Sequence, residues 1–380
     1  MSRRLVTVTH FFPAHGGGVE LVAEQLVRRF SASGMSVQWF SSATDPAPAA
    51  ADNQVAVGVP TLNIVERLTQ LPYPLWSPSV WPALWRAIGS ADIVHVHEHL
   101  YCGSLLATLM ARLRRRPLVV TQHMGALGLQ NRPMTLLYET GARLLGAVVF
   151  RAAARAIFIS ANVRGFFRLS GAAHTRLIFN GIETERFTPA APEQRQQLMN
   201  GAIAQAAAGR RIVLFVGRFV RKKGLRLLQT LAPRFPQVLW VFVGSGPETP
   251  AQWGYENVLV AGRVSHEKLV DYYRAADLLM LPSSGEGFPL VVQEALACGL
   301  GVLTTEEVAN ACPPARDLMR AQPTPGPDES AEPWERALRE TLTDSAYLGA
   351  REARARRAHE LWSWDHCASQ YLSLFDELAS

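Results

Sequence analysis

The chain has 380 residues, of which 48% are hydrophobic and 18% are charged, and its formal net charge is +6. The length allows two domains of ordinary size, and the composition is that of a core-forming globular protein, which excludes a disordered chain. No stretch of ~18 uncharged apolar residues, as a membrane span requires, occurs in the sequence. The longest candidate, 134–154, contains Glu139, Arg143 and Arg151.

The cysteines and the N-terminus bear on the cellular compartment. The four cysteines are widely scattered, which favours neither a disulfide framework nor a structural zinc site. The apolar run after Arg3 and Arg4 is too short for a signal peptide. We therefore expect a cytoplasmic protein. The excess of Lys and Arg suits nucleic acid, anionic lipid or phosphorylated substrates and does not choose between them.

Short apolar or β-branched runs predict two series of strands that alternate with helices. In the first series, strands are expected at 5–10, 36–41, 93–97, 118–121 and 156–160, with a helix at 20–33. In the second series, strands are expected at 212–216, 239–243, 258–261, 278–281 and 300–304, with helices at 225–232, 266–276 and 289–298. This alternation is typical of parallel sheets with crossover helices, so we predict two Rossmann-like halves.

Three further segments connect or follow these halves. The turn signal Asn180-Gly181 and the weakly apolar stretch that follows it predict the domain boundary. The segment 312–333 is rich in Pro, Gly, Asp and Glu and is expected to form a surface loop. Helices are expected within 334–360, and apolar residues at helical spacing predict a last helix within 361–378.

A glycine-rich turn that contains Gly17 and Gly18 follows the first predicted strand and precedes a helix. Glycines allow the backbone to approach an anion, and the start of a helix offers N–H groups. The spacing fits neither a dinucleotide fingerprint nor a P-loop, so NAD and ATP are not indicated. A single glycine-rich turn of this kind can also be an ordinary connection between a strand and a helix.

Histidines lie near the ends of two strands. His95, His97 and His99 alternate and are expected to share one face, where a metal site with Glu98 nearby is one interpretation. No Cys or Asp completes a ligand set, so we expect no metal centre. His123 follows the strand at 118–121, where it is either a ligand contact or a satisfied histidine at a strand edge.

Aromatic and basic side chains gather in the first half of the chain. The set comprises Tyr73, Trp76, Trp81, Trp85, Arg112, Arg114, Arg115 and Arg116. Trp and Arg together could touch a bilayer surface or a lipid-linked acceptor, and the alternative is an aromatic cluster that packs a loop. Basic residues elsewhere are spread out and lack an aromatic-rich surface, which argues against nucleic-acid binding.

Arg218 and Lys223 follow the first strand of the second series. Two cations at a strand end can neutralise a diphosphate leaving group, Arg through a bidentate fork and Lys as a point charge. Lys222 is adjacent, so the assignment of the lysine stays open. A solvated basic turn is the alternative interpretation.

Glu286 and Glu294 flank a predicted helix start. Glu286 lies in a glycine-flanked loop, Pro289 suits the first helical position, and Gly299 suits the C-terminal cap. At a rise of 1.5 Å per residue, Glu294 lies roughly 7 Å from that start. The start offers N–H groups and a positive dipole, which suit a pyrophosphate. A nucleotide-sugar matches this layout, with its sugar and its ribose on either side of the phosphates, whereas two incidental acids on a buried helix are the alternative.

The sequence around these two acids, with Gly-Phe-Pro-Leu and Glu-Ala-Leu-Ala-Cys-Gly, resembles the donor-site signature of retaining glycosyltransferases of the GT-B fold, particularly family 4. The resemblance covers nearly the whole chain and is strongest over 180–304. It includes the Asn-Gly-Ile-Glu stretch at 180–183, followed by Phe187 and Pro189. The segment 306–314 departs from the family pattern, which usually has a Gly-containing turn there, so sugar contacts at this segment stay open.

The resemblance implies a role for each candidate residue. Glu286 would position the transferred sugar, and Glu294 would hold the ribose. Arg218 and Lys223 would neutralise the diphosphate, and His123 would hydrogen-bond the donor sugar. The remaining donor-binding residues belong to the glycine-rich turn or to the helix start: Gly17, Gly18, Gly287, Phe288, Pro289, Leu290 and Val291.

The resemblance also implies the fold and the reaction. We expect an α/β protein of GT-B fold in which two Rossmann-like domains face each other across a cleft. Residues 1–182 would form the acceptor domain and 183–360 the donor domain, and 361–380 would form a helix that crosses back to the first domain. A sugar would pass from a nucleoside diphosphate to an acceptor hydroxyl, with retained configuration and by a front-face mechanism. No Asp-x-Asp motif is present, so no metal or other cofactor is expected.

The sequence leaves the acceptor and two alternative functions open. A glycan or a lipid-linked acceptor is expected, with peripheral contact at the inner face of an anionic membrane as one arrangement. A GT-B epimerase that acts on a nucleotide-sugar shares the fold but needs no acceptor. A non-catalytic module that binds a sugar nucleotide or a partner is the other alternative.

Overall fold

The computed structural model describes residues 2–62, 64, 73–126, 132–169, 173–191, 193–194, 207, 209–326 and 330–379. The chain forms two compact units. The first comprises Met1–Gly181 together with Trp364–Ser380, and the second comprises Ile182–Ser363. The boundaries expected from the sequence were 182/183 and 360/361.

The first unit contains a sheet of seven parallel strands in the order β3-β2-β1-β6-β7-β8-β9. Its strands are β1 (Arg4–Val8), β2 (Ser36–Ser42), β3 (Gln54–Val59), β6 (Ile93–His97), β7 (Leu118–Gln122), β8 (Arg155–Phe158) and β9 (Thr175–Leu177). Two short strands, β4 (Thr61–Leu62) and β5 (Leu75–Trp76), pair in antiparallel fashion over two residues each. The unit's longer helices are α1 (Gly18–Ala32), α3 (Trp81–Ser90), α4 (Cys102–Leu113), α5 (Arg132–Ala152), α6 (Ala161–Phe166) and α16 (Trp364–Ala379).

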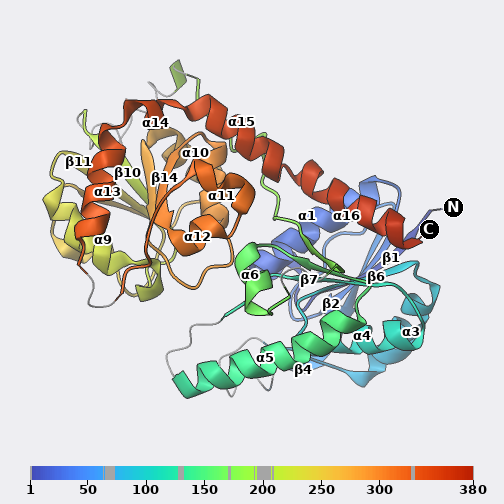
Figure 1. Ribbon diagram of the computed structural model, residues 1–380. Helices are drawn as coiled ribbons and strands as arrows, with labels where there is room; N and C mark the ends of the chain where they lie inside the picture. Colours follow the sequence, from blue (N-terminus) through green and yellow to red (C-terminus); the bar gives the residue numbers. More distant parts are fainter. Residues whose placement is uncertain are drawn as a thin grey trace. The chain divides into compact units, whose positions relative to one another are not determined.

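Helices cover both faces of this sheet and bury two separate hydrophobic cores (Figure 1). On one face, α1 and α16 meet over the strands through Phe30, Tyr371 and Phe375, all of which are buried. On the other face, side chains of α3, α4 and α5 pack around Phe150 and Phe158. The predicted return of the last helix to the N-terminal sheet is therefore confirmed, because α16 completes one of that sheet's two cores.

The second unit contains a sheet of six parallel strands in the order β12-β11-β10-β13-β14-β15. Its strands are β10 (Arg211–Val216), β11 (Val238–Val243), β12 (Val258–Gly262), β13 (Leu278–Leu281), β14 (Gly301–Thr305) and β15 (Arg320–Gln322). Its helices are α9 (Leu225–Leu231), α10 (His266–Ala275), α11 (Leu290–Ala297), α12 (Glu306–Asn310), α13 (Glu332–Thr343), α14 (Ser345–Gly349) and α15 (Arg351–Trp362). Every residue of β11 and β13 is buried, as expected of central strands with both faces covered.

The strand order of each sheet reverses direction at one place. In the first unit the reversal lies between β1 and β6, and in the second it lies between β10 and β13. Loops that leave two such strands diverge to opposite faces, so they open a crevice at the carboxyl ends of the strands, where open α/β sheets bind ligands. A ligand site is therefore expected in the loops after these four strands.

The prediction of a surface loop over 312–333 is wrong for the first half of that segment. A 3-10 helix, η6 (Pro313–Leu318), is followed by β15, which pairs with β14 along 303–305. The sequence Arg320-Ala321-Gln322 carries no strand signal by itself. The strand forms because the outer edge of β14 offers backbone hydrogen-bond partners, which only the assembled sheet provides.

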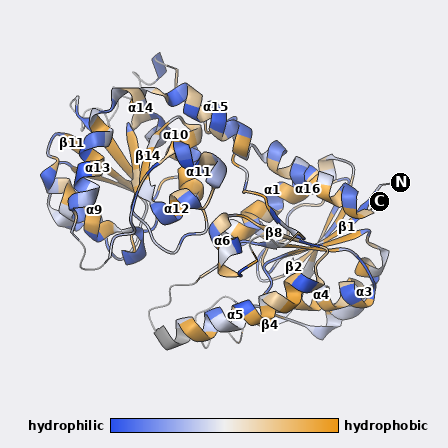
Figure 2. Cartoon of the chain, in the orientation of Figure 1, coloured by the Kyte–Doolittle hydropathy of each residue, from blue (hydrophilic) through white to orange (hydrophobic). Residues whose placement is uncertain are grey.

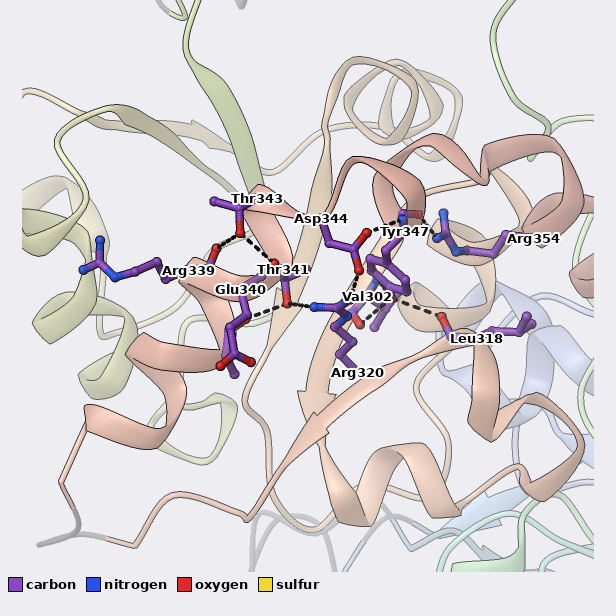
Figure 3. Close-up of polar contacts among 11 residues, drawn as sticks. Val302, Leu318, Arg320, Arg339, Glu340, Thr341, Thr343, Asp344, Tyr347 and Arg354 are labelled. Carbon is purple, nitrogen blue, oxygen red and sulfur yellow. Dashed lines mark hydrogen bonds and ion pairs between the residues drawn. The ribbon is translucent and has the colours of Figure 1, made fainter.

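A cluster around Tyr347 fastens α14 and α15 to this sheet (Figure 3). The Val302 N–H donates to the Tyr347 hydroxyl at 3.0 Å, and guanidinium groups of Arg320 and Arg354 each lie 4.6 Å from the Tyr347 ring centre. Arg354 is buried and donates to the carbonyl oxygen of Gly299 at 2.7 Å. Because Gly299 ends the segment that carries Glu294, this cluster also supports the candidate site described next.

Candidate functional site

Lys223 and Glu286 form an ion pair at the switch point of the second sheet. Lys223 lies in a 3-10 turn, η3 (Arg221–Lys223), after β10, and Glu286 lies in the loop after β13. Lys223 Nζ is 2.8 Å from Glu286 Oε1, and both side chains are largely shielded from solvent. Lys222, the other candidate lysine, is exposed. The geometry therefore joins Lys223, and not Lys222, to the first acid of the motif.

Glycines allow the loops after β10, β11 and β13 to pack this closely. A Cβ on Gly224 (φ +77°) would collide with the carbonyl oxygen of Pro282, and one on Gly244 (φ +143°) with that of Gly217. The Phe219 N–H donates to the Ser245 carbonyl at 2.8 Å, and the Ser284 N–H donates to the Lys222 carbonyl at 2.9 Å. The basic loop is thus fixed from both neighbouring strands before any ligand arrives.

Glu307 holds the loop that carries Glu286. It lies on α12, and its two carboxylate oxygens accept the N–H groups of Gly285 at 3.2 Å and of Glu286 at 3.1 Å. Glu307 lies within the segment that departs from the family pattern. Sequence reasoning missed it, because nothing in the spacing connects an acid after β14 to a loop after β13.

The helix that follows begins one residue later than predicted. Pro289 is the N-cap, and α11 starts at Leu290. The Val292 N–H donates to the Pro289 carbonyl at 3.0 Å, so the N–H groups left open for a ligand are those of Leu290 and Val291. The Phe288 ring is buried 5.5 Å from the Trp362 ring, so this residue can reach a ligand only through its backbone. Gly299 (φ +76°) ends the segment, because its N–H donates to Leu296 and that of Leu300 to Ala295.

Glu294 is buried on α11 and engages two side chains of α10. The Tyr273 hydroxyl donates to Oε2 at 2.8 Å, and His266 Nε2 lies 3.1 Å from Oε1. The carboxylate raises the pKa of His266, chiefly through this hydrogen bond. Phe187, from the linker after 180–183, packs against the His266 ring at 5.1 Å. Glu294 is therefore held in place, with one polar partner, His266, half exposed.

Arg218 differs from Lys223 in its surroundings. Its side chain is exposed and makes no hydrogen bond or ion pair with any residue that the structure describes. The second unit thus brings together Lys223, Glu286 and the start of α11 and leaves the Arg218 guanidinium on the surface of the same loop. Gly287 lies between Glu286 and the start of α11 and belongs to this group through its position in the chain.

The glycine-rich turn of the first unit carries an acid that the sequence analysis did not single out. Glu20, in the first turn of α1, is buried and lies 2.8 Å from His10 Nε2, whose ring stacks on Tyr101 at 3.8 Å. A Cβ on Gly17 would collide with the Glu20 carboxylate, whereas the space beside Gly18 is open. A carboxylate repels a phosphate, so of the two predicted glycines Gly18 is the one with room for an anion.

The three alternating histidines do not share one face. β6 ends at His97, and Glu98 adopts φ +65°, which turns the chain. The rings of His95 and His97 lie 4.4 Å apart, but His99 packs between Phe150 and Phe167 in the opposite core. Burial lowers the pKa of His95 to about 3 and that of His97 well below its usual value, so both are neutral. No group of three or more His, Cys, Asp or Glu in the described part of the chain could hold a metal ion.

His123 lies beside this histidine pair at the end of β7. Its Nε2 is 3.0 Å from His97 Nδ1, and burial lowers its pKa to about 3. The backbone N–H groups of His123 and Met124 both donate to the carboxylate of Glu98. Burial raises the pKa of Glu98 to about 7 against the opposing effect of these donors. His123 was predicted from the sequence as a candidate site residue, whereas Glu98 was noted only as an acid near a possible metal site.

The aromatic residues before β6 mostly pack the loop. Trp76 is buried, Tyr73 donates to the Leu100 carbonyl at 2.7 Å, and the Arg114 guanidinium lies 5.0 Å from the Trp85 ring centre. Trp81 alone among these four is exposed, at 47%. Across the described residues, no helix combines the length and the apolar character that crossing a bilayer requires.

Two family models match the chain in succession. The one described as Glycosyltransferase Family 4 matches residues 16–186, and the one described as Glycosyl transferases group 1 matches residues 202–357. The chain is 26% identical to a D-inositol 3-phosphate glycosyltransferase of Jonesia denitrificans, over 95% of this chain and 91% of the relative. It is 28% identical to D-inositol 3-phosphate glycosyltransferase 1 of Catenulispora acidiphila, over 94% of this chain and 90% of the relative.

Solved structures resemble the chain over nearly its whole length. Sucrose-phosphate synthase from Thermosynechococcus elongatus has a TM-score of 0.72 at 21% identity and covers 99% of both chains. Anabaena HepE, in complex with UDP, has a TM-score of 0.73 at 18% identity, over 99% of this chain and 100% of its own. At such low identity these likenesses bear on the fold alone.

Proposed function

Because the chain belongs to the group 1 and family 4 glycosyltransferases, enzymes with the GT-B fold, we propose that it transfers a sugar from a nucleoside diphosphate sugar to an acceptor hydroxyl with retained configuration. The observation that carries this proposal is the Lys223–Glu286 ion pair at the switch point of the second sheet. Before the donor binds, each charge satisfies the other. A bound diphosphate would take the ammonium, and the freed carboxylate would accept hydrogen bonds from the sugar.

The other residues of this edge supply the rest of the donor site. The first N–H groups of α11 and the positive end of its dipole would face the pyrophosphate. The exposed Arg218 would close on the phosphates as a bidentate fork. Glu294 would exchange the half-exposed His266 for a ribose hydroxyl while it keeps Tyr273.

The chemical step moves one bond at the anomeric carbon. The bond from that carbon to the phosphate oxygen breaks, the bond to the acceptor oxygen forms on the same face, and the acceptor proton passes to the departing phosphate. Positive charge on Lys223 and Arg218 stabilises the developing phosphate, which is the role a metal ion plays in other transferases. We therefore expect transfer to proceed in the presence of a chelator. The ring of His123 would hydrogen-bond the sugar.

The names of similar proteins support this choice of substrates. HepE has been solved in complex with UDP and with UDP-glucose, and the relatives are named as D-inositol 3-phosphate glycosyltransferases. These names favour a nucleotide-sugar donor and a hydroxyl-rich acceptor for this chain. A role in cell-surface glycan or glycolipid synthesis is the cellular counterpart that we propose.

One surface of the first unit supports a lipid-linked acceptor. The outer face of α5 carries Leu137, Leu144 and Val148, which are 75%, 68% and 65% exposed. Apolar positions recur along this helix (Figure 2). On the neighbouring α4, exposed Leu109 and Leu113 adjoin a group of arginines: Arg112, Arg114, Arg115 and Arg116. Apolar side chains bordered by cations suit the surface of an anionic bilayer, so we propose peripheral contact at the inner face of the membrane.

Vesicle sedimentation tests this contact. The protein should sediment with vesicles that contain anionic lipid and not with neutral ones, and Leu137→Glu should abolish sedimentation. The matched control is Leu62→Glu, which changes another exposed leucine, on β4, where the side chain is 61% exposed. Equal sedimentation of both variants, or equal binding to neutral vesicles, would exclude α5 as the contact.

Release of free nucleoside diphosphate tests the transferase itself. With a panel of nucleotide-sugars and acceptors, the wild type should release nucleoside diphosphate in a chelator-resistant, acceptor-stimulated reaction. Glu286→Ala should reduce the rate about 10²-fold or more, and Glu306→Ala, an exposed acid on the same edge, should not. An epimerase would give an isomeric nucleotide-sugar without a dependence on acceptor. Donor binding without turnover would identify a non-catalytic module.

A further inference from the structure

Glu98 combines two costly features at the switch point of the first sheet. Its backbone adopts φ +65°, a left-handed conformation that residues other than glycine rarely take. Its side chain is 0% exposed, and a carboxylate removed from water is unfavourable unless hydrogen bonds compensate it. Features of this kind persist where the surrounding structure requires them, and they cluster at functional sites.

The hydrogen bonds of Glu98 show what it holds. Oε1 accepts the backbone N–H groups of His123 and Met124, both at 2.7 Å, and Oε2 accepts the Gln122 side-chain amide at 2.6 Å. The same amide group donates to the Met124 carbonyl at 2.7 Å. All four polar contacts converge on residues 122–124, the turn that follows β7. Glu98 therefore fixes the backbone of the residue whose ring is proposed to meet the sugar.

The neighbouring His97 fixes the ring of His123. His97 Nδ1 lies 3.0 Å from His123 Nε2, and His97 Nε2 is buried without a hydrogen-bond partner among the described residues. A buried N–H without a partner is rarer than a buried acceptor without one, so the proton of His97 belongs on Nδ1. His97 then donates to His123 Nε2, and the remaining proton of His123 lies on Nδ1. The neutral ring thus presents an Nδ1–H donor.

We propose that Glu98 is a positioning residue for glycosyl transfer: its carboxylate holds the 122–124 turn so that His123 offers its Nδ1–H to a hydroxyl of the donor sugar. This inference rests on the proposed function only for the identity of the ligand. The juxtaposition of Glu98, His97 and His123 stands on the contacts above. Glu98 does not touch the sugar, and it acts through the backbone of His123.

The polarity of the contacts suggests a rescue experiment. In Glu98→Gln the oxygen can still accept the two backbone N–H groups, but the new amide faces the Gln122 amide, donor against donor. In Gln122→Glu two carboxylates face each other. In the double variant, Glu98→Gln with Gln122→Glu, one donor again faces one acceptor between residues 98 and 122, and residue 122 keeps an acceptor toward His99, whose backbone N–H donates to Gln122 at 3.3 Å. Residue 122 loses its donor to the Met124 carbonyl in that variant, so only a partial recovery is expected.

Steady-state kinetics of nucleoside diphosphate release should distinguish positioning from packing. Each single variant should lower kcat about 10²-fold, the loss expected for a reacting group displaced by about 1 Å, with little change in the KM of the donor. The double variant should recover at least part of the loss. Thermal unfolding midpoints measured in parallel show which variants are folded, and only folded variants are compared. Glu98→Gln is preferred to Glu98→Ala because it keeps the size and shape of the side chain.

Nitrogen-15 spectra of histidine-labelled protein give a readout that needs no activity. The wild type should show His123 neutral with its proton on Nδ1, and Glu98→Gln should shift or broaden that signal while the double variant restores it. Unchanged kcat and an unchanged His123 signal in folded Glu98→Gln would overturn the proposal, as would a loss of kcat that the double variant does not recover. If the wild type releases no nucleoside diphosphate, the proposed function fails, and the spectra still decide the role of Glu98.

Discussion

Lys223 Nζ lies 2.8 Å from Glu286 Oε1, although the two residues follow different strands of the second sheet. The strand order places β10 beside β13, and the carboxyl ends of these strands bring both loops to the same edge. The pair holds a cation and an anion ready for a ligand that carries both phosphate and hydroxyl groups.

Removal of the charge on Lys223 should slow sugar transfer far more than removal of the charge on Lys222. Lys223→Gln should lower kcat/KM for nucleoside diphosphate release by about 10²- to 10³-fold, because a charge that stabilises the leaving phosphate is lost. Lys222→Gln, one residue earlier and exposed, should stay near the wild-type value. A larger loss in Lys222→Gln would assign the phosphate contact to the other lysine.

The ion pair of His266 and Glu294 should make stability depend on pH. The carboxylate raises the pKa of His266, so the pair stabilises the fold fully below the ordinary histidine pKa of about 6.5 and loses this effect as the pH rises through the higher folded value. His266→Ala should therefore destabilise the protein more at pH 5.5 than at pH 8.5 in denaturant unfolding. In a Glu294→Gln background that difference should vanish, and its persistence would point to another partner.

Gly244 should tolerate no side chain, both because a Cβ would collide with a neighbour and because its φ is positive. A second glycine, Gly254, separates these two effects. In Gly244→Ala the Cβ collides with the Gly217 carbonyl, and the residue must adopt φ +143°. We expect a loss of at least about 2 kcal/mol in the free energy of unfolding, together with weaker donor binding. Gly254→Ala also requires positive φ, at +71°, but has nothing within 4 Å of the new Cβ, so it should cost only about 1 kcal/mol. Equal costs would show that the contact with Gly217 is relaxed.

The Tyr347 hydroxyl should contribute measurably to the stability of the second unit. Tyr347→Phe removes the acceptor of the Val302 N–H and leaves that group without its partner in a buried place, which should cost about 1–3 kcal/mol. Tyr272→Phe is the control, since the Tyr272 hydroxyl makes no hydrogen bond with a described residue. Urea unfolding of both variants measures the difference, and similar midpoints would mean that water replaces the lost contact.

The strands and most of the candidate site followed from local patterns. Buried parallel strands such as 93–97 and 278–281 are short apolar runs, and the structure has both at the predicted bounds. The start of α11 was recognisable because Pro and Gly have position-specific backbone requirements that chain order displays. Glu307 was not recognisable, because its hydrogen bonds join two loops that are neighbours only in the folded sheet.

The amino-acid order alone determined which segments become strands, which acids flank a helix start, and that two parallel sheets with crossover helices result, because these depend on residues close together in the chain. The tertiary structure decided which lysine meets Glu286, that Glu20 fills the space beside Gly17, and that His99 turns away from His95 and His97. Those outcomes depend on strand order and on a left-handed residue at Glu98, which bring distant side chains into contact or separate near ones, and no local spacing records them.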